Sequence, residues 1–294
     1  MVNKILNCAP SDPKGTDWVL LEYAEASSLP SEFSREDIYS AVTNQGSIGS
    51  CVGHAVSNTV NDREDFKNLD LSAMWVYKTA KKYDYWAGED YSGTSISGAY
   101  EGMRKEGVCL EQFFPYNMNT ENVEPLDGAS DDAATRKLKG YFYIPWEDTK
   151  AIKNMLLNES LSASLNLYNA FYDANDSGVV TAEGYFDSKP VGGHAMRLVG
   201  YKETEGVLYW RFENSWGVRW GDKGYVWVPD EVVQKSNIGG VYYGVWEGEI
   251  KRNIYYGKKK DKRALPIKWI HGFLNALLKL FGQKPKFGPE SKKK

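Results

Sequence analysis

Four stretches before residue 160 place apolar side chains at the three- and four-residue spacing of an amphipathic helix. They run over residues 51–65, 71–86, 94–105 and 147–158. Thr94 is a candidate N-cap for the third helix, which Gly107 ends. The pattern therefore predicts a largely helical first half.

After residue 160 the apolar residues follow the shorter period of β-strands. We predict strands over residues 161–167, 194–201, 207–213, 225–229 and 241–246. Because helices come first and strands later, we expect an α+β protein with two segregated halves in a domain over residues 1–250. Within that domain residues 1–30, which contain three prolines, predict an extended lead-in.

The helical period returns in the tail formed by residues 251–294. A helix over about residues 264–282 gathers six apolar residues on one face: Ile270, Phe273, Leu274, Leu277, Leu278 and Phe281. The tail carries 14 basic against two acidic residues, a charge of +12, whereas residues 1–250 carry 22 basic and 37 acidic residues, a charge of −15.

A basic amphipathic tail of this kind suits several roles. It can lie on an anionic membrane surface, dock in the groove of a partner protein, or pack on its own domain. A solvated tail without a partner is a fourth reading. Nucleic acid is not favoured, and the sequence gives no oligomeric state.

Composition adds three constraints. The chain has no run of about 18 apolar residues and no secretory signal at its start, so we expect a cytoplasmic or phage-associated protein, with peripheral membrane attachment left open. The three cysteines, Cys8, Cys51 and Cys109, cannot all pair, which excludes a disulfide scaffold. Any imidazole chemistry must come from His54, His194 or His271.

The first stretch with chemical character leads into the first predicted helix. Residues 44–50 are small and turn-forming, and Cys51 begins the helix. A helix N-terminus stabilises a thiolate, so Cys51 is a candidate nucleophile. The turn can bring the Gln45 amide beside the sulfur, where it and the Cys51 N–H would form an oxyanion hole. The alternative is a buried structural cysteine.

Two further stretches offer partners for this thiol. His194 opens a predicted strand after two glycines, and Asn214 ends another strand. On adjacent strands the Asn214 oxygen can hold one ring nitrogen of His194, as a catalytic imidazole requires. Trp216 can then shield that bond from water. Taken alone, His194 could equally be a half-buried residue without a catalytic role.

These three stretches together resemble the papain-like cysteine peptidases. The family's cysteine block, Q-G-x-C-G-S-C-W, is matched at five of its seven defined positions by residues 45–52. The histidine block, G-H-A-x-x-x-V-G-Y, and the asparagine block, N-S-W-G-x-x-W-G-x-x-G-Y, are matched in full by residues 193–201 and 214–225. The resemblance covers about residues 30–246 and is greatest to the bacterial and phage branch.

The resemblance implies a papain-like fold, with a helical half, an antiparallel β-barrel-like half and the active-site cleft between them. It implies that Cys51 is the nucleophile and His194 the general base and then acid, while Asn214 orients the imidazole and Gln45 donates to the oxyanion. The implied reaction is hydrolysis of peptide bonds through an acyl-thioester on Cys51. No cofactor and no metal are implied.

The resemblance also implies a substrate-binding set. It consists of Ser92, Gly93 and Thr94 for the substrate backbone, Ile96, Ser164 and Ala195 for a side-chain pocket, and Trp216. Two positions of the cysteine block depart from the family, because Ile48 replaces a disulfide-forming cysteine and Val52 replaces tryptophan. Only 44 residues precede Gln45, so we expect no long helical pro-region, and the tail is a candidate inhibitor.

Two other functions compete with proteolysis. A catalytically silent member of the same fold would bind peptides or act as an adaptor directed by its tail, but the intact residue set argues against silence. A Cys-His acyl transferase of the transglutaminase type would share the nucleophile. Such enzymes usually have Asp as the third residue and lack the block that begins at Asn214.

Overall fold

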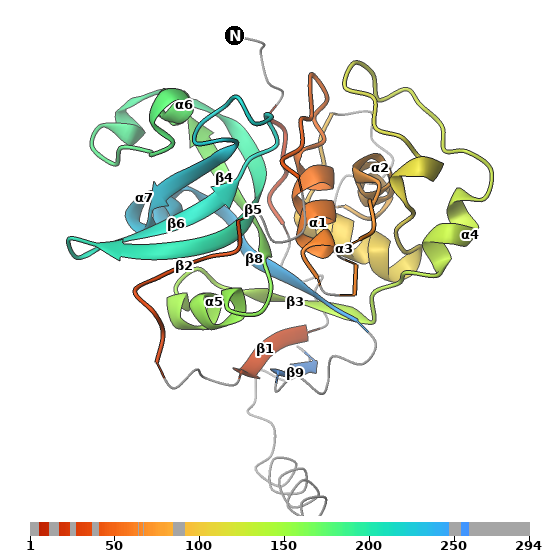
Figure 1. The fold of residues 1–294 in the computed structure, drawn as a ribbon, viewed down its shortest axis with the longest axis horizontal. Coiled ribbons are helices and arrows are strands. Elements are labelled where there is room, and N and C mark those ends of the chain that lie inside the picture. Colours follow the sequence, from red (N-terminus) through yellow and green to blue (C-terminus); the bar gives the residue numbers. More distant parts are fainter. Residues whose placement is uncertain are drawn as a thin grey trace, which may run out of the picture. The chain divides into compact units, whose positions relative to one another are not determined.

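The computed structural model describes residues 6–11, 18–23, 28–36, 41–63, 65–66, 68–84, 92–246 and 254–258 (Figure 1). Met1–Gly257 forms one compact unit and Lys258–Lys294 a second, of which Lys258 alone is described. The predicted tail helix over residues 264–282, and His271 within it, lie outside the described residues. Among the described helices none has the length and apolar character needed to cross a bilayer.

Four α-helices build one half of the first unit: α1 (Cys51–Asn61), α2 (Ala73–Tyr83), α3 (Ile96–Lys105) and α4 (Ala129–Ala134), with a 3-10 turn at Glu111–Phe113. The helices predicted over 51–65, 71–86 and 94–105 are confirmed with shorter ends. The predicted cap at Thr94 is wrong, because Ser95 accepts the Gly98 N–H at 3.1 Å while the Thr94 hydroxyl donates to Asp84.

The helix α1 is buried along its whole length. It lies between α2 on one side and the strands β4 (Leu161–Tyr168) and β5 (Pro190–Thr204) on the other (Figure 1). A helix enclosed on all sides has no solvent face. Its first residue, Cys51, is therefore held by packing from both halves of the unit.

The second half is a mostly antiparallel sheet in the order β7-β6-β5-β4-β8-β3-β1-β9, with β2 paired to β5. Besides β4 and β5, its strands are β1 (Trp18–Tyr23), β2 (Glu32–Ser34), β3 (Gly140–Ile144), β6 (Val207–Glu213), β7 (Tyr225–Pro229), β8 (Asn237–Val245) and β9 (Ile254–Lys258). All five predicted strands are present. Because the order runs from β7 to β9 without closing, the predicted barrel-like half is an open sheet.

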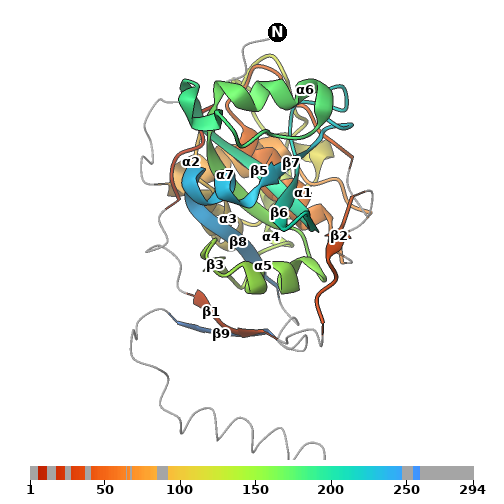
Figure 2. The same ribbon diagram turned by 90° about the vertical axis from the view of Figure 1, so that its left-hand side faces the viewer.

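Three α-helices accompany the sheet: α5 (Thr149–Leu156), α6 (Ala174–Ser177) and α7 (Asp230–Ser236), with 3-10 turns at Asn169–Asp173 and Tyr185–Asp187. In Figure 2, α6 and α7 lie toward the viewer and the helical half lies behind the strands. The buried apolar residues form two clusters, one under each half. The predicted segregation into two halves is confirmed, and each half has its own core. The helix predicted over 147–158 is α5, which packs in the core of the sheet half.

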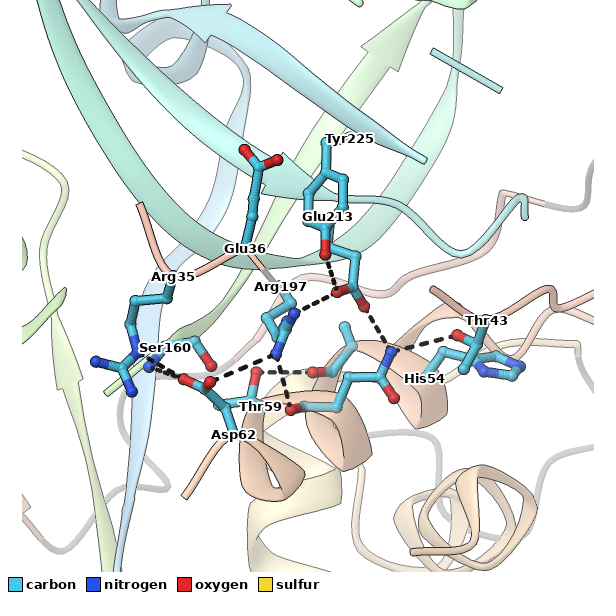
Figure 3. A network of polar contacts seen from close by, with 12 residues as sticks. Arg35, Glu36, Thr43, His54, Thr59, Asp62, Ser160, Arg197, Glu213 and Tyr225 are labelled. Atoms are coloured by element: carbon cyan, nitrogen blue, oxygen red, sulfur yellow. Dashed lines mark hydrogen bonds and ion pairs between the residues drawn. The ribbon is translucent and has the colours of Figure 1, made fainter. Parts of the chain in front are cut away.

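A buried network of charges joins α1 to the sheet (Figure 3). On neighbouring strands Arg197 of β5 pairs with Glu213 of β6, and Glu213 also accepts a hydrogen bond of 2.6 Å from Asn58 of α1. Asp62, which follows α1, lies 3.9 Å from Arg197 and accepts a hydrogen bond of 2.7 Å from Arg35. Burial alone would lower the pKa of Arg197, but Glu213 and Asp62 raise it.

This network generates a stability prediction. The side chains of Glu213 and Arg197 are only 2% and 1% exposed, so Glu213→Gln leaves a buried guanidinium without its main counter-charge. We expect the free energy of unfolding to fall by about 3–5 kcal/mol, measured by urea denaturation. The matched control is Glu231→Gln, whose exposed carboxylate lies 4.0 Å from Lys235 and should change stability by less than about 1 kcal/mol. Equal losses in the two variants would contradict a stabilising role for the network.

Candidate active site

Cys51 occupies the N-terminus of α1, as predicted, and is fully buried. The N-cap residue, Ser50, makes no side-chain hydrogen bond to the helix, and its hydroxyl instead contacts that of Tyr116 at 2.5 Å. The positive end of the helix is therefore not neutralised by a capping side chain. It favours negative charge on the Cys51 sulfur.

The surroundings of Cys51 also favour its thiolate. A hydrogen bond from the Cys8 thiol, then contacts with the His194 ring and its charge, and the Ala195 N–H hold the pKa of Cys51 well below its usual range. Burial acts in the opposite direction, and the hydrogen bonds outweigh it. The same contact, together with burial, raises the pKa of Cys8. The pair thus combines a Cys51 thiol of lowered pKa with a Cys8 thiol of raised pKa.

His194 lies on β5 and is brought to Asn214, the residue that follows β6. The His194 Nε2 atom lies 2.8 Å from the Asn214 Oδ1 atom, which accepts the ring proton. That oxygen also accepts the Ser215 N–H at 2.8 Å, so the amide is held in one orientation. Because Nε2 is taken, Nδ1 is the nitrogen left for Cys51.

Trp216 covers this hydrogen bond. Its ring centroid lies 5.0 Å from that of His194, and it packs among Phe171, Tyr172 and Trp220. His194 and Asn214 are at most 1% exposed. A buried bond does not compete with water, so the imidazole keeps its orientation.

Gln45 lies beside the start of the asparagine block and is fully buried. Its Oε1 atom accepts the Ser215 hydroxyl at 2.7 Å, its Nε2 donates to the Ile48 carbonyl at 2.8 Å, and its backbone N–H donates to the Ser215 carbonyl. The following Gly46 has φ +60°, and a Cβ there would lie 2.4 Å from the Met118 carbonyl oxygen. The turn predicted between Gln45 and Cys51 thus requires this glycine.

Three of the predicted substrate-binding residues lie near the two thiols. Ile96 and Ala195 belong to the same apolar cluster as Cys8 and Cys51, and Ser164 pairs with Ala195 across β4 and β5 and contacts the Cys8 thiol. On the helical side, Thr94 is buried. Gly93 donates its N–H to the Tyr77 hydroxyl at 3.2 Å, and Ser92 contacts the same hydroxyl.

Residues 6–11 run across this site, which the sequence did not predict. The Cys8 N–H donates to the Gly193 carbonyl at 2.9 Å, the Ala9 N–H to the Thr94 carbonyl at 2.9 Å and the Ser11 N–H to the Ile238 carbonyl at 3.1 Å. A Cβ on Gly193 would lie 2.0 Å from the Cys8 carbonyl oxygen. Cys8, which had no predicted role, therefore lies against the candidate nucleophile, and this part of the lead-in belongs to the site.

Other residues singled out in the sequence lie in the core. His54 is 3% exposed, and its ring centroid lies 4.4 Å from that of Tyr116, so it is a core residue. Cys109 is fully buried, and burial raises its pKa to about 12. Within the described ranges, no group of three or more His, Cys, Asp or Glu side chains is arranged to hold a metal ion.

Comparison with known proteins places this arrangement in a family. The model of the papain family cysteine protease matches residues 29–244. Two similar curated proteins come from Arabidopsis thaliana. The probable cysteine protease RDL2 is 26% identical over 69% of this chain and 56% of the relative. The KDEL-tailed cysteine endopeptidase CEP2 is 24% identical over 74% of this chain and 59% of the relative. The chain thus spans less than two thirds of the length of these relatives.

Solved structures share the fold. Xylellain, a cysteine protease from Xylella fastidiosa, aligns with a TM-score of 0.68 at 21% identity, over 84% of this chain and 99% of that one. The bromelain protease from Ananas comosus, solved in complex with the E64 inhibitor, aligns with a TM-score of 0.55 at 20% identity, over 74% of this chain and 100% of that one. With the family model covering residues 29–244, the chain belongs to the papain family of cysteine proteases.

Proposed function

We propose that this chain is a thiol peptidase that hydrolyses peptide bonds through an acyl-thioester on Cys51. The observation that carries the proposal is the His194 ring, held by Asn214 at 2.8 Å and in polar contact with a cysteine at a helix N-terminus. A nucleophile, a base and a group that orients the base are the parts that covalent acyl transfer requires.

In the first half of the reaction the Cys51 thiolate attacks the carbonyl carbon of the scissile bond. The oxygen becomes an oxyanion, which the Cys51 N–H and the Gln45 amide stabilise. His194, as imidazolium, gives its proton to the leaving amine. In the second half, neutral His194 takes a proton from water, which attacks the thioester and frees Cys51.

A polypeptide is the substrate class that the site supports. The Gly193 and Thr94 carbonyls accept backbone N–H groups from residues 8 and 9, so the groups flanking Cys51 are suited to an extended chain. A substrate would use the same acceptors. Residues 6–11 must therefore leave before a substrate binds.

The alternatives receive less support. The third residue of the site is Asn214 rather than the Asp usual for transglutaminase-type enzymes, and the family match is to proteases. A silent, peptide-binding member would not need an acidic thiol beside His194.

The first prediction concerns turnover by the reduced protein, measured as hydrolysis of a fluorogenic peptide. Wild type should cleave the peptide, Cys51→Ala should abolish cleavage, and His194→Ala should lower kcat. Gln45→Ala should reduce kcat about 10²–10³-fold through loss of an oxyanion donor. Cys109→Ala, which changes a buried cysteine away from the site, is the matched control and should keep wild-type kcat. Hydrolysis that survives Cys51→Ala would overturn the proposal.

A second prediction concerns pH. Because the pKa of Cys51 is lowered, its thiolate should persist as the pH falls below about 8.5, the ordinary thiol value, and be lost only in more acidic solution. Thiolate absorbance near 240 nm should show one such acidic step in wild type and in Cys109→Ser, and none in Cys51→Ser. A wild-type titration centred at or above the ordinary thiol value would contradict the site geometry.

For the tail we propose an anionic partner, a membrane surface or an acidic protein, in a cytoplasmic or phage-associated setting. The support is the charge of +12 on residues 251–294 against −15 on the remainder. Removing residues 259–294, which keeps β9 in place, should abolish sedimentation with anionic liposomes and leave peptide hydrolysis intact. Unchanged sedimentation would remove the membrane from the proposal.

A further inference from the structure

Two thiols meet at the candidate active site. Cys8 and Cys51 are 5% and 0% exposed, neither forms a disulfide, and both belong to one buried cluster in which the two thiols are in polar contact. They are separated by 42 residues of sequence. The proposed hydrolysis uses Cys51 alone, which leaves Cys8 without a role in that chemistry.

The backbone on both sides fixes this meeting. Cys51 stands in the first turn of α1, while the Cys8 N–H is bonded to Gly193 and its neighbour Ala9 to Thr94. The glycine at position 193 permits the close approach, since any Cβ there would collide with the Cys8 carbonyl. A disulfide between the two residues requires their sulfurs to approach from this contact to about 2.05 Å.

We propose that Cys8 and Cys51 are a redox modification site, which a peroxide converts into a disulfide that locks residues 6–11 over the nucleophile. The proposal rests on the proposed function in one respect: both need a reactive Cys51 thiolate. It adds a second fate for that thiolate, which is oxidation in place of acylation.

The chemistry balances with hydrogen peroxide as the oxidant. The Cys51 thiolate attacks one peroxide oxygen, forming an S–O bond and breaking the O–O bond, and the hydroxide that leaves takes a proton from the His194 imidazolium. Cys8 sulfur then attacks the Cys51 sulfenic sulfur. The S–S bond forms, the S–O bond breaks, and the second hydroxide leaves with the Cys8 proton. Two thiols lose two electrons, and one peroxide becomes two waters.

Burial determines when this oxidation occurs. A fully buried Cys51 meets peroxide only while residues 6–11 are lifted, and Cys8 returns to it when they close. The disulfide then holds the closed state covalently. A thiol reductant reverses it, so the lock differs from irreversible oxidation to sulfinic acid.

Cys109 provides an internal control. It is fully buried, and burial together with the charge of Asp132 raises its pKa to about 12, so it stays a thiol at neutral pH. A thiol reacts far more slowly than a thiolate. Cys109 should therefore remain unmodified under conditions that oxidise Cys51.

The test oxidises the full chain with hydrogen peroxide near neutral pH, alkylates the remaining thiols, digests without reduction and identifies linked peptides by mass. In wild type and Cys109→Ser we expect a Cys8–Cys51 linked peptide, and in wild type the free thiols fall from three to one. Labelling of Cys51 by an epoxysuccinyl inhibitor should be lost on oxidation and restored by dithiothreitol. In Cys8→Ser the linked peptide should be absent, and labelling should be lost without recovery.

Two results would overturn the inference: Cys51 sulfinic acid with a free Cys8 in oxidised wild type, or equal recovery of labelling in wild type and Cys8→Ser. Peptide hydrolysis by the reduced protein separates this inference from the proposed function. Hydrolysis without the linked peptide rejects the lock alone, whereas the linked peptide without hydrolysis rejects the peptidase and keeps the lock.

Discussion

The relative position of α1, β5 and β6 depends on one buried set of charges. It sets the geometry of the site, because α1 carries Cys51, β5 carries His194 and Asn214 directly follows β6. Arg197 follows His194 by three residues on β5, Glu213 immediately precedes Asn214, and Asn58 lies on the helix that Cys51 begins. The pairing of Arg197 with Glu213 and the bond from Asn58 to Glu213 therefore fix His194, Asn214 and Cys51 together. Apolar packing has no comparable directionality, so it would hold these elements less specifically.

Burying these charges costs desolvation free energy, although it also orients the elements that carry them. Desolvation of a carboxylate and a guanidinium is unfavourable by several kcal/mol for each ion, and it is offset only where every polar atom nearby is arranged to compensate. Glu213 accepts bonds from Arg197, Asn58 and Tyr225, so the compensation comes from three separate elements. A shift of any one of them exposes the remaining charge to an apolar surrounding. The network therefore acts against alternative registers of β5 and β6.

How far the sequence predicts this structure depends on the range of the interactions involved. Four of the seven α-helices and five of the nine strands in the described residues follow from local periodicity. The motifs also anticipate that His194 meets Asn214, and the structure brings Gln45 to Ser215. The six-residue helix α4 is too short for a periodic signal. Arg197 and Glu213 look like ordinary strand charges until the register pairs them. Their burial is a tertiary property that no local pattern contains.

Residues 6–11 were missed for a related reason. Their contacts with Gly193, Thr94 and Ile238 are backbone hydrogen bonds, which place no requirement on side-chain type and leave no motif. Such bonds contribute about 0.5–1.5 kcal/mol each, so three of them hold the segment by only a few kcal/mol. A tethered segment, however, competes with free peptide at an effective concentration on the order of millimolar. Hydrogen bonding alone thus gives incomplete closure that abundant substrate can overcome, whereas a covalent bond between Cys8 and Cys51 removes the competition altogether.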